Sequence, residues 1–290
     1  MLSIEPKDIS VGKLHGYLLA AISPRPIAFA STVNENGEVN LAPFSFFNVF
    51  SANPPVVIFS PARRVRDNTT KHTLENVLKT NEVVINIVNY DIVQQMSLAS
   101  TEYAEGINEF VKAGLTEVAS DLVKPPRVAE SPVQLECKVT EVTALGTEGG
   151  AGNLIIAEVV KLHINENILD SEGKIDSSKI DLVARMGGNW YSRAREGMFE
   201  VPKPLSTIGI GIDMLPKEIK NSAILTGNDL GILGNVEALP GSDEILEYRK
   251  NNSTLVSENI TENHKKTQQL IAEGNVTEAW KLLLVNTVSE

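Results

Sequence analysis

Alternating and continuous apolar runs over the first two thirds of the chain predict β-strands. Apolar and polar residues alternate at 133–142, which places Cys137 on an apolar face as a small core residue rather than a nucleophile. Residues 154–164 give the partner strand. Further strands are predicted at 26–33, 38–47, 56–59 and 82–88, with a turn at 51–55. Asn36-Gly37 is typical of a hairpin turn, and Pro43 indicates an edge strand or a bulge.

Helical periodicity is confined to short segments in this region and dominates after it. The spacing after Thr73 predicts a helix that starts there, and Asp91 is expected to cap another that runs to Leu98. Helices are predicted at about 222–234, 241–250, 257–273 and 276–285. We therefore expect a mainly β, antiparallel barrel-like domain over 1–204, ending at Pro202-Lys203-Pro204, and a helical C-terminal extension over 205–290.

Charge and cysteine content narrow the class of protein. The 290 residues carry 26 Lys and Arg against 37 Asp and Glu, a net charge of −11, which argues against general binding to nucleic acid. A single cysteine fits a reducing compartment. No basic-then-apolar leader and no bilayer-length apolar run is visible. We expect a cytoplasmic protein with no membrane partner.

A basic stretch at 61–73 is the first candidate for chemistry. The stretch has a single acidic residue, Asp67, against four basic ones, so it is locally cationic within an acidic chain. The basic residues are Arg63, Arg64, Arg66 and Lys71. It ends on the predicted helix start, where free backbone N–H groups, the helix dipole and nearby cations favour an anion such as phosphate. A solvated loop followed by an ordinary helix cap is the alternative.

Phenylalanines are concentrated beside this stretch. Six of the eight lie between positions 29 and 59. They form either a strand-rich core or the wall of a pocket for a flat apolar ligand. Strand alternation over 44–48 would place Ser45 and Phe47 on one face. The glycine-rich segment 146–152 lacks the spacing of a dinucleotide fingerprint and joins two strands, so it is interpreted as a flexible hairpin loop.

Four ordered motifs make a family resemblance visible. They are the block at 23–48, which begins Ser23-Pro-Arg-Pro-Ile-Ala-Phe-Ala-Ser-Thr; Ser51-x-x-Pro54-Pro55-Val-Val-Ile-Phe-Ser60; Lys71-His72-Thr73-Leu74-x-Asn76; and Arg185-x-Gly187-Gly188-x-x-Tyr191. Together they resemble the flavin reductase-like family of FMN-binding split barrels, over roughly residues 5–200. The resemblance implies a six-stranded antiparallel barrel of Greek-key type that binds FMN non-covalently at a homodimer interface.

The resemblance also implies positions for the cofactor. It places Lys71 and Thr73 on the phosphate, Ser31 and Thr32 at the phosphate and ribityl side, and Ser60 near the ribityl chain. It places along the isoalloxazine edge Asn40, Ala42, Ser45, Phe46, Phe47 and Asn48. Arg25 contributes a charge or braces its strand, and Arg185 and Tyr191 cover the flavin, as could Trp190 if it is not a core residue. His72 replaces the aspartate that is usual in the family.

Three functions follow as alternatives. The first is an NAD(P)H-dependent FMN reductase, in which hydride transfer occurs at the flavin and no catalytic side chain is required. The second is a flavoredoxin-type electron carrier that exchanges electrons with a redox protein partner. The third is a split-barrel module for haem or pyridoxal phosphate. His163 is interpreted as a solvent-facing strand residue, with contact to the nicotinamide or substrate as the alternative. No metal-ligand spacing is found among the four histidines.

Overall fold

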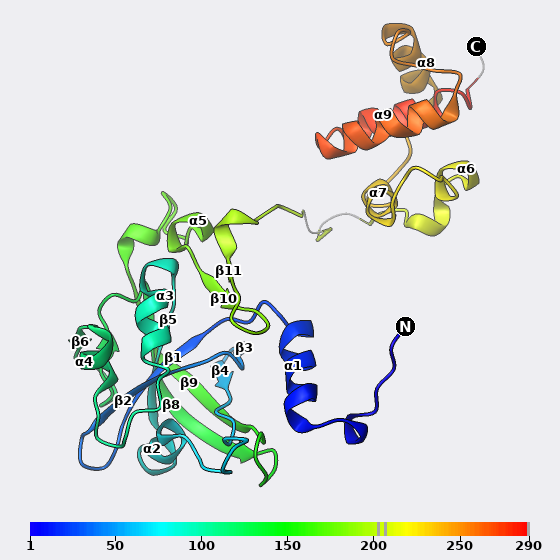
Figure 1. The fold of residues 1–290 in the computed structure, drawn as a ribbon. Coiled ribbons are helices and arrows are strands. Elements are labelled where there is room, and N and C mark those ends of the chain that lie inside the picture. The colour runs from blue at the N-terminus through cyan, green and yellow to red at the C-terminus, as the bar shows by residue number, and fades with distance from the viewer. Residues whose placement is uncertain (202–203, 206–207, 289–290) are drawn as a thin grey trace. The chain divides into compact units, whose positions relative to one another are not determined.

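The chain forms two compact units, Met1–Phe199 and Glu200–Glu290, each with a buried core of its own (Figure 1). The computed structural model describes residues 1–201, 204–205 and 208–288. Two residues of the predicted boundary Pro202-Lys203-Pro204, namely 202 and 203, lie outside the described residues. All described strands belong to the first unit, whereas the second contains helices.

A seven-stranded sheet, antiparallel throughout, dominates the first unit. Its strands, in spatial order, are β2 (Val39–Phe44), β1 (Ala28–Val33), β5 (Glu82–Ile87), β8 (Val133–Ala144), β9 (Asn153–Ile164), β4 (Pro55–Phe59) and β3 (Phe47–Ala52). Two short strand pairs accompany it, β6 (Glu117–Val118) with β7 (Arg127–Val128) and β10 (Val183–Arg185) with β11 (Tyr191–Arg193). The antiparallel mainly β prediction is confirmed, but the main sheet has seven strands rather than the six that the resemblance implies, and the Greek-key arrangement stays a prediction.

The strands of the seven-stranded sheet lie where the sequence pattern predicts them, with one exception, whereas the short strands β6, β7, β10 and β11 were not predicted. Positive φ at Gly37, +83°, closes the turn between β1 and β2, and Pro43 lies on the edge strand β2, where its missing N–H costs no ladder bond. The exception is β3, which occupies part of the segments that we predicted as one long strand and as a turn. A bend at Ser45-Phe46 separates β2 from β3, so the expected alternation of 44–48 is wrong.

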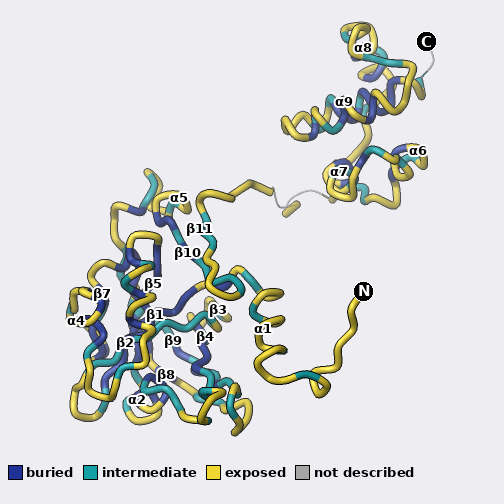
Figure 2. Tube along the Cα trace, viewed as in Figure 1, coloured by how far each residue is buried: buried dark blue, intermediate teal, exposed yellow. Residues whose placement is uncertain are grey.

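Helices pack on this sheet, and buried side chains form a core on both sides of it. Helix α2 (His72–Thr80) contacts β1 and β2, and its Leu74 and Val77 join the cluster inside the sheet. Helices α3 (Val93–Leu98) and α4 (Glu109–Ala113) belong to a second cluster around Phe29 and Phe110. Figure 2 shows the buried strands and the largely exposed helix α1 (Val11–Ala21), which the sequence pattern did not predict. The unit also contains α5 (Ser177–Ile180).

Two predicted helix starts are wrong by a few residues. A 3₁₀ turn at Tyr90–Ile92 contains Asp91, and α3 begins only at Val93, after Ile92 as its cap. Helix α2 begins at His72, so Lys71 is the cap residue and Thr73 lies in the first turn.

The second unit is a small helical bundle with its own core. Its helices are α6 (Lys217–Lys220), α7 (Gly227–Leu233), α8 (Ser242–Asn251), α9 (Ile260–Ala272) and α10 (Val276–Leu284). The four predicted helices are therefore present. Trp280 is 1% exposed at the centre, and its indole N–H donates to the Leu233 carbonyl at 3.1 Å. Among the described helices of either unit, none is long and apolar enough to cross a membrane.

Candidate cofactor-binding groove

A groove follows the outer edge of β2, where no strand of the described chain pairs with it. One cavity of about 200 Å³ is lined by Ile27, Pro43, Phe44, Ser45, Met96, Ser100, Arg185 and Tyr191. A second, of about 40 Å³, is lined by Asn40, Ala42, Arg64, Lys71, His72, Thr73, Glu109 and the segment 99–103. Ser100 lines both cavities, so the two adjoin along β2.

The narrow end has the chemistry of an anion site. Lys71 precedes the first turn of α2, and no described side chain caps that terminus. The first N–H groups of a helix have no partner within the helix, so those of His72 and Thr73 face the groove end with the positive end of the dipole. Arg64, whose side chain is 17% exposed, lines the same cavity. Two members of the predicted basic cluster, Arg64 and Lys71, thus line the cavity at the helix terminus, whereas Arg63 donates to Asn68 and does not line it.

Hydrogen bonds between amides and hydroxyls fix this terminus against the sheet. Asn40 Nδ2 donates to Thr73 Oγ1 at 2.9 Å, and Asn76 Nδ2 donates to Thr32 Oγ1 at 3.0 Å. Thr32 is fully buried and Thr73 is 1% exposed. Both hydroxyls are therefore held in place: the first pair ties α2 to edge strand β2, which borders the groove, and the second ties it to the neighbouring strand β1.

Arg25 braces the wide end. Its guanidinium donates to the carbonyl of Ile22 at 2.6 Å, to that of Met186 at 3.2 Å, and to that of Leu19. These bonds tie the end of α1 to the β10–β11 hairpin. Burial lowers the pKa of Arg25, and the nearby charge of Arg185 lowers it further. Of the two expectations for Arg25, the geometry favours the brace.

The β10–β11 hairpin places a cation and an aromatic ring over the wide cavity. The Arg185 guanidinium lies 4.7 Å from the centre of the Tyr191 ring. Backbone hydrogen bonds of 2.8 and 2.9 Å between Arg185 and Arg25 attach the hairpin to the start of β1. The side chains of Arg185 and Tyr191 therefore line the same cavity as Ser45, although they are far from it in the sequence.

Several predicted residues lie outside the two cavities. Phe47 packs in the sheet core, Phe46 is 40% exposed, and Asn48 is exposed. Ser60 is buried beside the glycine-rich loop, where a methyl added at Gly152 would stand 2.7 Å from its hydroxyl oxygen. Ser31 is fully buried, and its hydroxyl has no hydrogen-bond partner among the described residues.

His163 is not solvent-facing, so that interpretation is wrong. Its Nε2 lies 2.6 Å from Glu136 Oε1, and its side chain is 19% exposed. Burial raises the pKa of Glu136, but backbone N–H bonds from Asp121 and Leu122 and the bond to His163 outweigh it and lower the pKa overall. Asp121, Glu136 and His163 lie close enough to ligate a metal. Because Glu136 already has partners on both oxygens, the cluster fits a structural role.

Glu102 is the residue at the groove that the sequence pattern did not reveal. Its carboxylate contacts Arg64 Nε at 2.9 Å, Arg66 Nη2 at 2.9 Å and Lys71 Nζ at 3.4 Å. Hydrogen bonds from Arg66 and Arg64 and the charge of Lys71 hold its pKa at about 2. The cations are thus partly neutralised by the chain itself.

The fold and the groove define a class of protein. A seven-stranded antiparallel sheet with accompanying helices is consistent with the split-barrel fold of flavin reductases. The model of the flavin reductase like domain matches residues 20–179, more than half of the chain, and the chain belongs to this family.

Individual relatives agree with this assignment. An uncharacterized protein of Aquifex aeolicus is 36% identical over 188 residues, which cover 65% of this chain and 93% of the relative. Nitrilotriacetate monooxygenase component B from Bacillus cereus has a structure similar at a TM-score of 0.65, with 29% identity, over 69% of this chain and 98% of that chain. Flavoredoxin of Desulfovibrio vulgaris, at 22% identity and a TM-score of 0.53 over 63% of this chain and 92% of that chain, shares the fold.

Proposed function

We propose that the chain is an FMN-binding, NAD(P)H-dependent flavin reductase. The observation that carries this proposal is the groove itself, which runs from an uncapped helix terminus with Lys71 and Arg64 to a wider cavity of mixed polar and apolar lining beside the edge of β2. A phosphate suits the cationic end, and a flat ring system suits the other. Membership of the flavin reductase-like family supports the same ligand.

The residues present fit FMN. The N–H groups of His72 and Thr73, with Lys71 and Arg64, would hold the phosphate. Asn40 and Ala42 would follow the middle of the ligand along β2. The wide cavity would take the ring edge, with polar contacts from Ser45 and Arg185 and an aromatic face from Tyr191. We retain as proposed contacts, on the resemblance alone, Ser31, Thr32, Phe46, Phe47, Asn48 and Ser60.

Bound FMN would supply the redox chemistry by accepting hydride from NADH or NADPH. The chain's part is to bind and orient the two reactants. Arg25 supports this by holding the β10–β11 hairpin, and therefore Arg185, against the groove. Arg185 then lies where it can stabilise negative charge on a ring placed beside Ser45.

A homodimer is part of this proposal. Val49 and Phe50 on edge strand β3 are 66% and 64% exposed, and within the described unit α1 buries none of its residues. Apolar surface of this kind is typical of a protein interface. We further propose that 1–204 is the flavin domain, that 205–290 is a helical extension, and that the protein is cytoplasmic, supported by its single buried cysteine.

The test is the visible spectrum of the purified protein after incubation with FMN and removal of the unbound flavin, followed by anaerobic mixing with NADH or NADPH. We expect flavin bands, and rapid bleaching with at least one nicotinamide. Flavin bands without bleaching would favour the flavoredoxin-type carrier. An absence of flavin bands after addition of FMN would refute both flavin functions and leave another ligand, such as haem or pyridoxal phosphate.

A further inference from the structure

The cationic end of the groove already contains a carboxylate from its own chain. Glu102 contacts three cations, Arg64 and Arg66 at 2.9 Å and Lys71 at 3.4 Å. A carboxylate and a phosphate accept the same charge-assisted hydrogen bonds from arginine and lysine. The side chain therefore satisfies two of the donors, Arg64 and Lys71, that a ligand phosphate would require.

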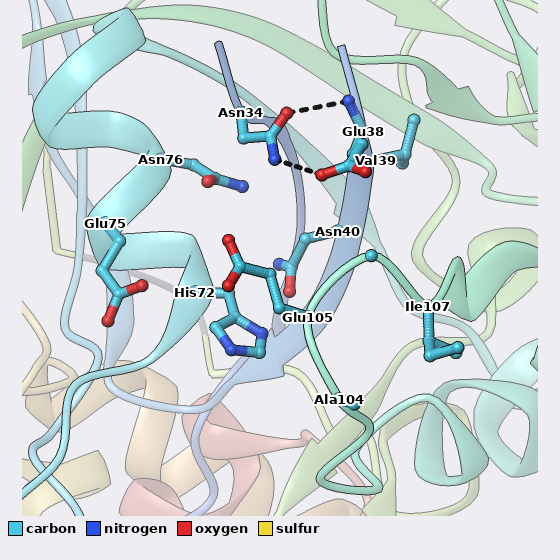
Figure 3. A pocket seen from close by; sticks show the side chains of 11 residues that line it. Asn34, Glu38, Val39, Asn40, His72, Glu75, Asn76, Ala104, Glu105 and Ile107 are labelled. Carbon is cyan, nitrogen blue, oxygen red and sulfur yellow. Dashed lines mark hydrogen bonds between the residues drawn. The ribbon is translucent and has the colours of Figure 1, made fainter. Parts of the chain in front are cut away.

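The segment that carries Glu102 lies across the groove. Residues 99–103 line the narrow cavity opposite Asn40 and Lys71, and 104–107 line a neighbouring pocket opposite His72 and Asn76. Figure 3 shows the Glu105 side chain reaching from this segment toward His72 on α2 and Asn40, with Ala104 and Ile107 on the same loop. We call the segment 99–107 the strap. It joins α3 to α4 and contains no helix or strand, whereas both flanking helices have buried side chains.

The narrow cavity is small while the strap is in this position. At about 40 Å³ it has room for about one to three water molecules. A phosphate group with its bonded carbon is several times larger than a water. A phosphate held by Arg64 and Lys71 needs the donors that the Glu102 carboxylate now contacts, so the ion pairs of Glu102 with these two residues are lost as those of the ligand form.

We propose that Glu102 is a built-in competitor for the flavin phosphate, so that FMN binds as an exchangeable ligand rather than as a permanent group. This inference rests on the proposed function, because it concerns the same site. Displacing Glu102 costs the ligand only a modest part of its binding free energy, because exposed ion pairs are weak. The side chains of Glu102 and Arg66 are 43% and 71% exposed. A modest cost lowers affinity without abolishing it, as exchange requires.

The test compares ligand affinity in wild-type protein and in E102Q, by titration of FMN and riboflavin with fluorescence detection. Riboflavin has the same ring and ribityl chain but no phosphate. We expect E102Q to bind FMN about tenfold more tightly, because exposed ion pairs no longer oppose the phosphate, and to bind riboflavin as wild type does. E105Q is the matched control: it removes the same charge from the strap, and Glu105 makes no ion pair with any described residue.

Each other result overturns the inference. Unchanged or weaker FMN binding by E102Q means that Glu102 does not compete, and equal tightening by E105Q means that general charge rather than the ion pairs is responsible. Equal tightening of FMN and riboflavin means that the substitution merely loosens the strap. If Lys71→Ala weakens FMN binding while E102Q has no effect, the proposed phosphate site stands and only the inference falls. If no variant binds FMN, the proposed function itself has failed.

Discussion

Replacing Lys71 by alanine tests the location of the phosphate directly. Lys71 is the cap residue of α2 and lines the narrow end of the groove, and its side chain is 32% exposed. Truncation removes one ammonium from the proposed site. It leaves in place the N–H groups of the first turn and Arg64, so the site is weakened rather than destroyed.

Two contributions of opposite sign set the size of the effect. A hydrogen bond to a charged group contributes roughly 1.5–3 kcal/mol. In the ligand-free protein the same ammonium contacts Glu102 at 3.4 Å, and losing an exposed pair of this kind offsets about 0.2–1 kcal/mol of that contribution. The net loss of FMN binding free energy is therefore about 1–2 kcal/mol, which corresponds to a roughly 5- to 30-fold higher Kd.

The assay is a titration of FMN against the protein, followed by quenching of flavin fluorescence. Lys79→Ala is the control, because Lys79 lies in the last turn of the same helix and pairs with Glu35 at 3.2 Å at the surface. It should leave Kd unchanged. The Lys71 effect should also shrink as salt is added, since charge at this partly exposed position is screened. Equal Kd values for Lys71→Ala and wild type would refute the assignment of the phosphate to α2.

Two further predictions concern the helical unit. Gly209→Ala places a methyl 2.6 Å from the Gly234 carbonyl oxygen, so the free energy of unfolding, measured by urea denaturation, should fall by about 1–3 kcal/mol. Gly231→Ala is the control, because its methyl meets no described atom within 4 Å outside its own helix backbone and chain neighbours, and it should not lower the free energy of unfolding. Burial lowers the pKa of His264, whose Nδ1 lies 2.7 Å from the Ser222 hydroxyl, so the unfolded state binds the proton more tightly. The thermal midpoint of this unit, followed by circular dichroism, should therefore fall as pH drops below about 6.5, and a pH-independent midpoint there would contradict the assignment.

Local patterns were sufficient for most of the fold. Alternation of apolar and polar residues and the Asn36-Gly37 turn depend on near neighbours, so β1, β2, β8 and β9 could be located from the sequence. Helix α1 could not, because Gly12 and Gly16 lower its helix propensity and its apolar residues face no core within the unit. Strand β3 was missed because the closely spaced Phe44, Phe46 and Phe47 suggested one continuous strand and concealed the bend at Ser45-Phe46.

In the candidate site, too, the features set by neighbouring residues could be predicted, and those set by the tertiary fold could not. The cationic end could be predicted, since the basic residues and the helix that they precede are adjacent in sequence. Glu102 could not, because it lies about thirty residues after Lys71 in a stretch without periodicity, and only the tertiary fold brings it there. The solvent-facing interpretation of His163 was wrong because strand alternation does not reveal a buried acid on the neighbouring strand. That acid is Glu136, and its contact with the imidazole leaves the His163 side chain only partly exposed.

The two kinds of contact at the cationic end suit different tasks. The pairs Asn40–Thr73 and Asn76–Thr32 are buried or nearly so, and breaking either would leave an unsatisfied polar group at a cost of about 1–3 kcal/mol. They therefore hold the terminus of α2 in one position whether or not a ligand is present. The Glu102 pairs are exposed, and water can replace them at little cost. A rigid donor set beneath an easily displaced carboxylate is the arrangement that allows a phosphate to enter and leave without refolding the site.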